Sequence, residues 1–180
     1  MKLWLARHAR TRVGEGICYG ASDLPADAAA TQAAAQVLAW AVPQGTPVRS
    51  SPLQRCTALA DALFALRPDL AWQADARLAE MDFGSWEGRP WADVGEDEFA
   101  RWNADFLDYR FGGRESVRAL LDRVEVARQD SARAGAQALW ITHAGVIRAV
   151  DLLVRGVLPL QAAQWPREAV AFGGWRCLDG

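Results

Sequence analysis

The stretch LWLARHA at residues 3–9 decides the fold class, and LWITHAG at residues 139–145 repeats its pattern. In each stretch a short apolar run is closed by a polar residue, a histidine and an alanine. Such runs are typical of buried strands in an α/β sheet, and ligands bind beyond the carboxyl ends of these strands. His8 and His143 are the only histidines in the chain, so we predict that both imidazoles face one cleft. The alternative is that each is an ordinary hydrogen-bonded group after a strand.

Strand and helix patterns alternate along the rest of the chain, without a linker or a repeat. Besides the strand that ends before His8, we predict helices at about 27–40, 53–66, 96–109, 115–134 and 146–154, and strands at 47–50, 70–73, 137–141 and 169–178. This alternation predicts one domain over residues 1–180. The fold class is α/β: a three-layer α-β-α sandwich in which helices cover both faces of a mostly parallel central sheet.

Length, charge and cysteine content limit the function classes. A chain of 180 residues forms one domain that buries roughly 70% of its unfolded surface. The three cysteines are odd in number and form no Cys-x-x-Cys pair, which argues against a disulfide framework or a zinc site and favours a cytoplasmic protein. The apolar run at the N-terminus is too short for a signal peptide or a membrane span. A net charge of -2 disfavours nucleic-acid binding.

Arginines gather at two of the predicted strand ends. Arg7, Arg10 and Arg12 surround His8, and Arg55 follows the second strand. A guanidinium presents a planar fork of donors that suits phosphate or carboxylate, although surface solvation explains any single arginine. After this strand, Ser51 and Gln54 have the spacing of a capping box. We therefore predict that Ser51 caps the next helix and that Arg55, in its first turn, acts with the helix N-terminus on one anion.

The segment 78–88 is the third feature, a loop with two glycines and three carboxylates beside aromatic residues. The carboxylates are Glu80, Asp82 and Glu87. From these residues alone, a solvated acidic loop is the simplest interpretation.

Four motifs in this order resemble the histidine phosphatase superfamily, which has the phosphoglycerate mutase-like fold. They are Arg7-His8, Ser51-Pro52-Leu53-Gln54-Arg55, the Glu-x-x-Phe-Gly-x-Trp-Glu-Gly run that starts at Glu80, and Thr142-His143-Ala144-Gly145. The resemblance spans residue 2 to about residue 178. Within the superfamily, the segments 2–8, 18–25 and 80–87 are most similar to the α-ribazole-5'-phosphate phosphatases of cobalamin synthesis. Phosphoglycerate mutases are longer, and phosphohistidine phosphatases typically lack the glutamate motif.

The resemblance implies a metal-independent hydrolase that uses no cofactor and acts on a small-molecule phosphate ester. His8 would be the nucleophile that forms a phosphohistidine, and Arg7, Arg55 and His143 would hold the phosphoryl oxygens. Glu80 would protonate the leaving group and then act as base on water, with Asp82 as its rival. Alternatives are a broad-specificity or phosphoglycerate mutase-like enzyme on a sugar phosphate or nucleotide, and a phosphate-binding protein whose catalytic site has decayed.

Two positions depart from the pattern of the superfamily. Ala9 stands where most members have glycine, and Gly14 stands where many have an asparagine that helps hold the phosphoryl group. We expect other groups to substitute for this asparagine: Arg10, Arg12, or the backbone around Tyr19 and Gly20.

Three of the nine tryptophans lie where this fold commonly places a cap over the cleft. They are Trp86, Trp91 and Trp102. One of them could stack on a substrate ring, but packing between helices is the simpler expectation.

Overall fold

Five strands and five α-helices alternate along the chain in the computed structural model, which describes residues 1–157 and 161–179. The predicted domain also includes residues 158–160 and 180, which lie outside the described part. The strands are β1 (Lys2–Arg7), β2 (Val48–Ser50), β3 (Trp72–Ala74), β4 (Gln137–Thr142) and β5 (Trp175–Asp179). The helices are α1 (Ala28–Ala41), α2 (Gln54–Leu66), α3 (Glu96–Ala104), α4 (Val117–Ala134) and α5 (Ala144–Arg155). Short 3₁₀ helices are formed by Ala76–Leu78, Gly84–Trp86, Trp91–Asp93, Phe111–Gly113 and Ala162–Gln164.

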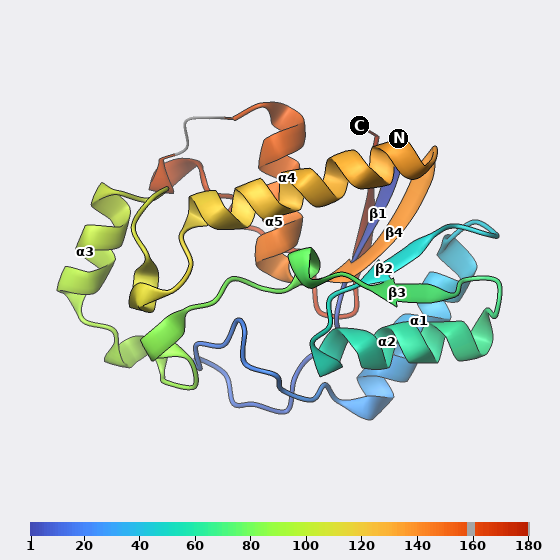
Figure 1. The fold of residues 1–180 in the computed structure, drawn as a ribbon. Helices are drawn as coiled ribbons and strands as arrows, with labels where there is room; N and C mark the ends of the chain where they lie inside the picture. Colours follow the sequence, from blue (N-terminus) through green and yellow to red (C-terminus); the bar gives the residue numbers. More distant parts are fainter. Residues whose placement is uncertain (158–160, 180) are drawn as a thin grey trace.

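The strands form one sheet in the order β3-β2-β4-β1-β5 (Figure 1). Strands β1 to β4 are parallel to their neighbours, whereas β5 pairs antiparallel with β1 at the sheet edge. Helices α1 and α2 cover one face, and α4 and α5 cover the other. The predicted mostly parallel sheet with helices on both faces is confirmed. No helix in the described part is long and apolar enough to cross a membrane.

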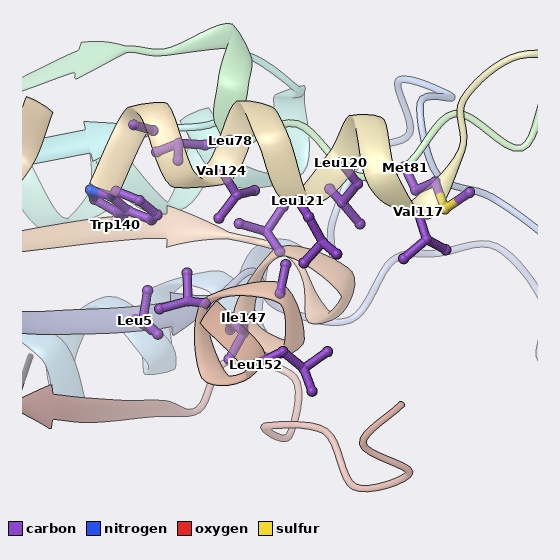
Figure 2. Close-up of a cluster of buried hydrophobic side chains, with 14 of the residues drawn as sticks. Leu5, Leu78, Met81, Val117, Leu120, Leu121, Val124, Trp140, Ile147 and Leu152 are labelled. Atoms are coloured by element: carbon purple, nitrogen blue, oxygen red, sulfur yellow. The ribbon is translucent and has the colours of Figure 1, made fainter. Parts of the chain in front are cut away.

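Alternating side chains along β4 divide the core into two clusters. Trp140 packs with α4 and α5, in the cluster drawn in Figure 2, whereas Leu139 and Ile141 pack with α1 and α2. Successive side chains of a strand point to opposite faces, so a strand covered on both sides is apolar throughout. This is why β4 reads as a continuous apolar run in the sequence.

Several predicted boundaries are wrong. Ser116 caps α4, which begins at Val117 instead of residue 115, and α5 begins at Ala144 instead of residue 146. Helix α3 ends at Ala104 instead of residue 109, and β3 begins at Trp72 instead of residue 70, because Leu70 closes the turn after α2 by donating to the Arg67 carbonyl. The last strand covers Trp175–Asp179 instead of residues 169–178. Residues 169–174 cross the end of β1, where the N–H of Gly173 donates to the His8 carbonyl at 3.0 Å. Residues 169–174 therefore bond to the end of β1 as a loop, and strand pairing with β1 begins only at Trp175.

The predicted capping box of α2 does not form. Leu53 is the N-cap residue and makes no side-chain cap bond, while the Gln54 N–H donates to the Asp23 carboxylate at 2.6 Å. Ser51 is fully buried, and its hydroxyl lies 2.7 Å from Nε2 of His143. The helix terminus is therefore occupied by a carboxylate of the protein, and Ser51 belongs to the cluster of histidines.

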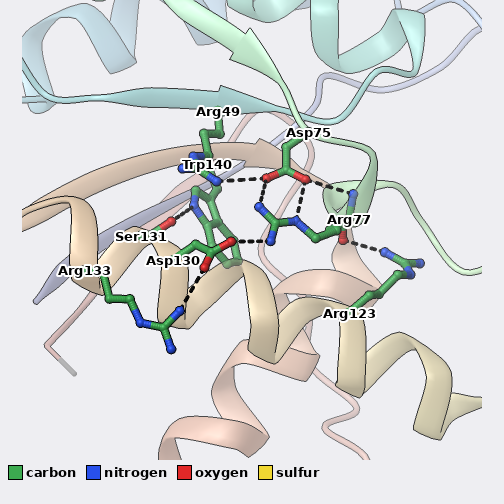
Figure 3. Close-up of polar contacts among 8 residues, drawn as sticks. All are labelled: Arg49, Asp75, Arg77, Arg123, Asp130, Ser131, Arg133 and Trp140. Atoms are coloured by element: carbon green, nitrogen blue, oxygen red, sulfur yellow. Dashed lines mark hydrogen bonds and ion pairs between the residues drawn. The ribbon is translucent and has the colours of Figure 1, made fainter.

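A network of ion pairs joins the sheet edge to α4 (Figure 3). Asp75 binds Arg49 and Arg77, and Arg77 also binds Asp130 of α4. From α4, Arg123 donates to the carbonyls of residues 77 and 79 at 2.7 Å and to the Glu80 carbonyl at 3.2 Å. These bonds fix the backbone of the segment that carries Glu80.

Candidate active site

The ends of three adjacent parallel strands bring the motif residues together. His8 follows β1, Ser51 follows β2, and His143 follows β4, which lies between the other two strands. The centroids of the two imidazoles are 5.1 Å apart, with 60° between the ring planes. The prediction that both imidazoles lie in one place is confirmed.

His8 is held as a neutral imidazole. Its Nδ1 lies 2.7 Å from the carbonyl oxygen of Ala9. A carbonyl can only accept, so Nδ1 carries the proton and Nε2 keeps its lone pair. The side chain is only 3% exposed. Burial, together with the positive charge of Arg55, lowers the pKa of His8 to about 3.

His143 is fully buried, and both of its ring nitrogens have partners. Arg55 donates from Nε to Nδ1 of His143 at 3.3 Å, so Nδ1 is the acceptor and Nε2 carries the proton toward the Ser51 hydroxyl. The Cys56 thiol lies 3.5 Å from Nε2. Burial is the main reason that the pKa of His143 lies well below its ordinary value. The ring is therefore also neutral.

Arg55 has no exposed surface and lies beside His143. Its terminal nitrogens donate to the carbonyls of Ser22 at 2.6 Å and Gly20 at 2.5 Å. In the observed arrangement the guanidinium therefore holds the loop before α1 as well as His143. To contact a phosphoryl group, it would have to exchange at least one of these carbonyls for an oxygen of the ligand.

Arg7, the last residue of β1, contacts the segment that leads to β5. Its guanidinium carbon is 3.6 Å from the centre of the Phe172 ring, and Nη1 donates to the Val170 carbonyl at 2.8 Å. Nε is buried and has no hydrogen-bond partner among the described residues. Burial lowers the pKa of Arg7, whereas the Tyr19 and Glu80 side chains raise it. Arg7 thus keeps one buried donor that no group in the described part of the chain uses.

Glu80 lies at the N-terminus of α5, close to His143. Its carboxylate accepts the N–H of Gly145 at 2.9 Å and its neighbour Met81's N–H at 3.1 Å. Asp82, the rival candidate, accepts the N–H of Gly84 and pairs with Arg114 at 3.3 Å. The structure thus brings Glu80, and not Asp82, to the cluster of histidines.

Tyr19 and Gly20 contact Arg55. The Tyr19 ring lies 5.4 Å from the guanidinium carbon of Arg55, and the Tyr19 hydroxyl accepts from Thr11. Gly20 gives its carbonyl to Arg55 and its N–H to both carboxylate oxygens of Glu87, at 3.0 and 2.9 Å. Because that N–H is occupied, it is not available to replace the missing asparagine.

Arg10, Arg12 and Gly14 lie further out. The two arginines are exposed, and all three residues line an open cavity of 830 Å³ whose wall includes Tyr19 and Phe172. Ala9 is buried beneath this region, and its carbonyl orients His8. Within the described ranges, no group of three or more His, Cys, Asp or Glu residues is arranged to hold a metal ion.

The three cap tryptophans have different environments. Trp91 and Trp102 line a second cavity together with Glu80. Trp86 is not in its wall; its indole donates to Glu98 at 3.3 Å. All three also contact Phe111. These four rings belong to separate helical segments, so the expected packing between helices is observed for each tryptophan.

Three groups near the site were not predicted from the sequence. Ser51 had been interpreted as a cap, Glu87 as one of several loop acids, and Phe172 as part of a strand. Serine, glutamate and phenylalanine fit the predicted environments as well as the observed ones. Only the positions of residues distant in the chain assign Ser51 to His143, Glu87 to Gly20, and Phe172 to Arg7.

Comparisons with known proteins match nearly the whole chain. The family model described as Histidine phosphatase superfamily (branch 1) matches residues 3–179. No curated protein sequence matches the chain significantly.

Solved structures match over nearly the whole chain. The crystal structure of TTHB049 from Thermus thermophilus is similar at 30% identity and a TM-score of 0.76, covering 99% of this chain and 94% of that one. A phosphoglycerate mutase from the same organism is similar at 29% identity and a TM-score of 0.74, covering 99% and 93%. The mycobacterial glucosyl-3-phosphoglycerate phosphatase shares the fold at 24% identity and a TM-score of 0.78, covering 98% and 88%.

Proposed function

This chain belongs to the histidine phosphatase superfamily, and we propose that it hydrolyses phosphate monoesters, without a metal ion, through a phosphohistidine formed on His8. Family membership and relatives named phosphatase or phosphoglycerate mutase support a phosphoric monoester hydrolase. The observation that carries the proposal is the bond from Nδ1 of His8 to the Ala9 carbonyl. It leaves an unprotonated Nε2, which is the form of imidazole that can attack phosphorus.

In the first step, the lone pair of His8 Nε2 forms a bond to phosphorus, and the bond from phosphorus to the leaving oxygen breaks. Arg7 and Arg55 stabilise the negative charge on the non-bridging oxygens. Neutral His143 adds an N–H once it turns from Ser51 toward the ligand. Because both imidazoles are uncharged and buried, the positive charge at the site is concentrated on the arginines.

Glu80 completes both steps in this proposal. In its protonated form it gives a proton to the leaving oxygen as the ester bond breaks. The resulting carboxylate then takes a proton from water, the water oxygen bonds to phosphorus, and the electrons of the P–N bond return to His8. The position of the carboxylate at the first turn of α5, two residues beyond His143, supports this role.

We propose α-ribazole 5'-phosphate, in the nucleotide-loop branch of cobalamin synthesis, as the physiological substrate. The support is the resemblance of segments 2–8, 18–25 and 80–87 to α-ribazole-5'-phosphate phosphatases. The relative named phosphoglycerate mutase makes a phosphoglycerate the second candidate. Comparison of kcat/KM for both compounds, a sugar phosphate and a nucleotide decides between them, and a preference below about tenfold would indicate broad specificity.

The chemistry is tested by labelling the enzyme with a ³²P-phosphate monoester. We expect an acid-labile, base-stable label that His8→Ala abolishes, whereas His143→Ala still acquires it slowly. Turnover of p-nitrophenyl phosphate should persist in EDTA. Undiminished turnover in His8→Ala would overturn the mechanism, and no hydrolysis of any phosphate ester would favour a decayed binding protein.

A further inference from the structure

A partly enclosed cavity of 210 Å³ lies beside Glu80, between the segment that follows Glu80 and the helices α3, α4 and α5. At roughly 30 Å³ per molecule, it has the volume of about seven waters. Its wall is mostly apolar and includes the aromatic residues Phe83, Trp91, Trp102, Phe106 and Trp165. The charged residues of the wall are Glu80 and Arg148, and the Arg148 guanidinium donates to the carbonyls of residues 167 and 168. These rings support one another: Trp102 stacks on Phe106, which meets Trp165 edge to face. The cavity is thus a mostly apolar site beside the proposed proton donor.

The position of the Glu80 carboxylate identifies the part of the substrate that this cavity faces. Both oxygens are bound by residues of the cavity wall, one by the Met81 N–H and the other by the Gly145 N–H. A general acid must lie within hydrogen-bond reach of the oxygen that it protonates. A leaving oxygen that Glu80 protonates would lie beside this cavity, which has room for the rest of the leaving group.

Two other cavities lie near the site and fit a leaving group less well. One also includes Glu80 in its wall, but that wall is rich in charged groups: Arg110, Arg123 paired with Glu115 at 2.7 Å, and Arg114 paired with Asp82 at 3.3 Å. The other is the outer cavity beside Arg10 and Arg12, and Glu80 is absent from its wall. Of the three, the aromatic cavity alone combines contact with Glu80 and apolar walls.

A donor in the wall gives a second indication of a ligand. The indole N–H of Trp102 is buried and has no acceptor among the described residues. A buried N–H without a partner costs about 1–3 kcal/mol. Because the nitrogen is buried, an acceptor carried by a ligand in the cavity would remove this penalty only after the indole ring turns toward it, and a purely hydrocarbon ligand would not remove it.

Resting on the proposed phosphatase function, we propose that this cavity binds the leaving group of the substrate, an uncharged alcohol with an aromatic ring and a hydrogen-bond acceptor, and that Trp102 selects it. The ring would be removed from water among Trp91, Trp102 and Phe106. Small hydrophilic phosphates leave the cavity unfilled and gain nothing from it. Trp102 does not contact the phosphoryl group and is a specificity residue, not a catalytic one.

The test compares 3-phenylpropyl phosphate with propyl phosphate, because their leaving oxygens have nearly the same basicity. We expect the wild-type enzyme to prefer the phenyl compound by about 30-fold in kcat/KM, the effect of burying a ring. Trp102→Ala should lose most of this preference, and circular dichroism with urea denaturation reports whether the variant is folded. Trp40→Ala is the matched control, because Trp40 is 91% exposed on α1.

The indole N–H is tested separately with Trp102→Phe and a pyridylpropyl phosphate. This variant should retain the preference for phenyl but lose roughly tenfold on the pyridyl compound. Equal losses on both compounds would overturn the role of the N–H. If wild-type enzyme hydrolyses phenylpropyl and propyl phosphate equally well, the cavity is not the leaving-group site, although the phosphatase proposal survives. Hydrolysis of neither compound nor of p-nitrophenyl phosphate would instead overturn the proposed function.

Discussion

Arg55 donates from Nε to Nδ1 of His143 at 3.3 Å, and both side chains are fully buried. The two residues are 88 positions apart: Arg55 lies in the first turn of α2, which follows β2, and His143 follows β4, the neighbouring parallel strand. Since the arginine must donate, the contact fixes His143 as the tautomer with a proton on Nε2. One arginine thus sets the hydrogen-bonding direction of an imidazole and also holds the loop that contains Gly20 and Ser22.

Arg55→Lys should reduce both activity and stability, although it keeps the charge. An ammonium group is a point charge and cannot replace the planar fork that reaches His143 and two carbonyls. We expect kcat/KM to fall by about 100-fold or more, and the free energy of unfolding to fall by about 2–3 kcal/mol. Phosphatase assays and urea denaturation measure the two effects. Arg133→Lys, an exposed position on α4, is the control, and equal behaviour of the two variants would contradict the prediction.

Glu87→Gln should loosen the same loop from the other side. The Glu87 carboxylate accepts from the N–H groups of Gly20, Ala21, Ser22 and Phe83 and from the Ser22 hydroxyl. An amide has one acceptor oxygen, and its NH₂ would face N–H donors. We expect a loss of about 2–4 kcal/mol in the free energy of unfolding, measured by urea denaturation.

The control for this variant is Glu96→Gln, at an exposed position in the first turn of α3. It should change stability by no more than about 0.5–1 kcal/mol. Because Arg55 binds the carbonyls of the loop that Glu87 holds, Glu87→Gln should also lower kcat/KM. A variant as stable as wild type would show that the five contacts add nothing net.

Local patterns predicted the parts of the molecule that depend on neighbours in the sequence. The apolar runs before His8 and His143 predicted two central strands, because a strand that is buried on both faces is apolar throughout. The alternation of these strands with helices that bury one face predicted the layers. The proximity of the two imidazoles followed from parallel strands ending at one edge.

Competition between distant groups could not be predicted in this way. Ser51 satisfies the local rule for a helix cap, yet His143 takes its hydroxyl and Asp23 takes the helix N-terminus. Nothing in the sequence near Glu87 indicates that it meets Gly20, 67 positions away. Each of these choices depends on which partner the fold brings closest, and local propensity carries no information about that.

The two histidines should make stability fall as the solution becomes mildly acidic. Burial lowers the pKa of His8 to about 3 and that of His143 well below its ordinary value. Above about pH 6.5 the folded and unfolded chains are both neutral at these positions. Below it the unfolded chain binds protons that the folded chain does not, so the contribution to stability is lost as pH falls from about 6.5 toward 3.

The expected slope is up to about 1.4 kcal/mol per pH unit for each histidine. Urea denaturation between pH 7.5 and 5 measures it in a range above the titration of most carboxylates. The chain has no other histidine, so His8→Asn should reduce the slope by about half. A slope that is the same in wild type and variant would mean that His8 is protonated normally in the folded protein.

Gly145→Ala should separate catalysis from stability. Gly145 lies in the first turn of α5, and a methyl group there would collide with the Glu80 carboxylate. Arg123 holds the backbone at Glu80, so the carboxylate has to turn away instead of shifting with its segment. Alanine is the better helix former by about 1 kcal/mol, so the free energy of unfolding should stay level or rise.

The loss of activity in Gly145→Ala should depend on the leaving group. Propyl phosphate needs protonation of its leaving oxygen, and a displaced Glu80 should lower its kcat by about 100-fold or more. p-Nitrophenyl phosphate releases a stable anion and should lose much less. Gly95→Ala is the control, because nothing lies within contact of the added methyl group. Equal losses on the two substrates would mean that Gly145→Ala disturbs phosphoryl binding, and Glu80 would then lose its role as proton donor.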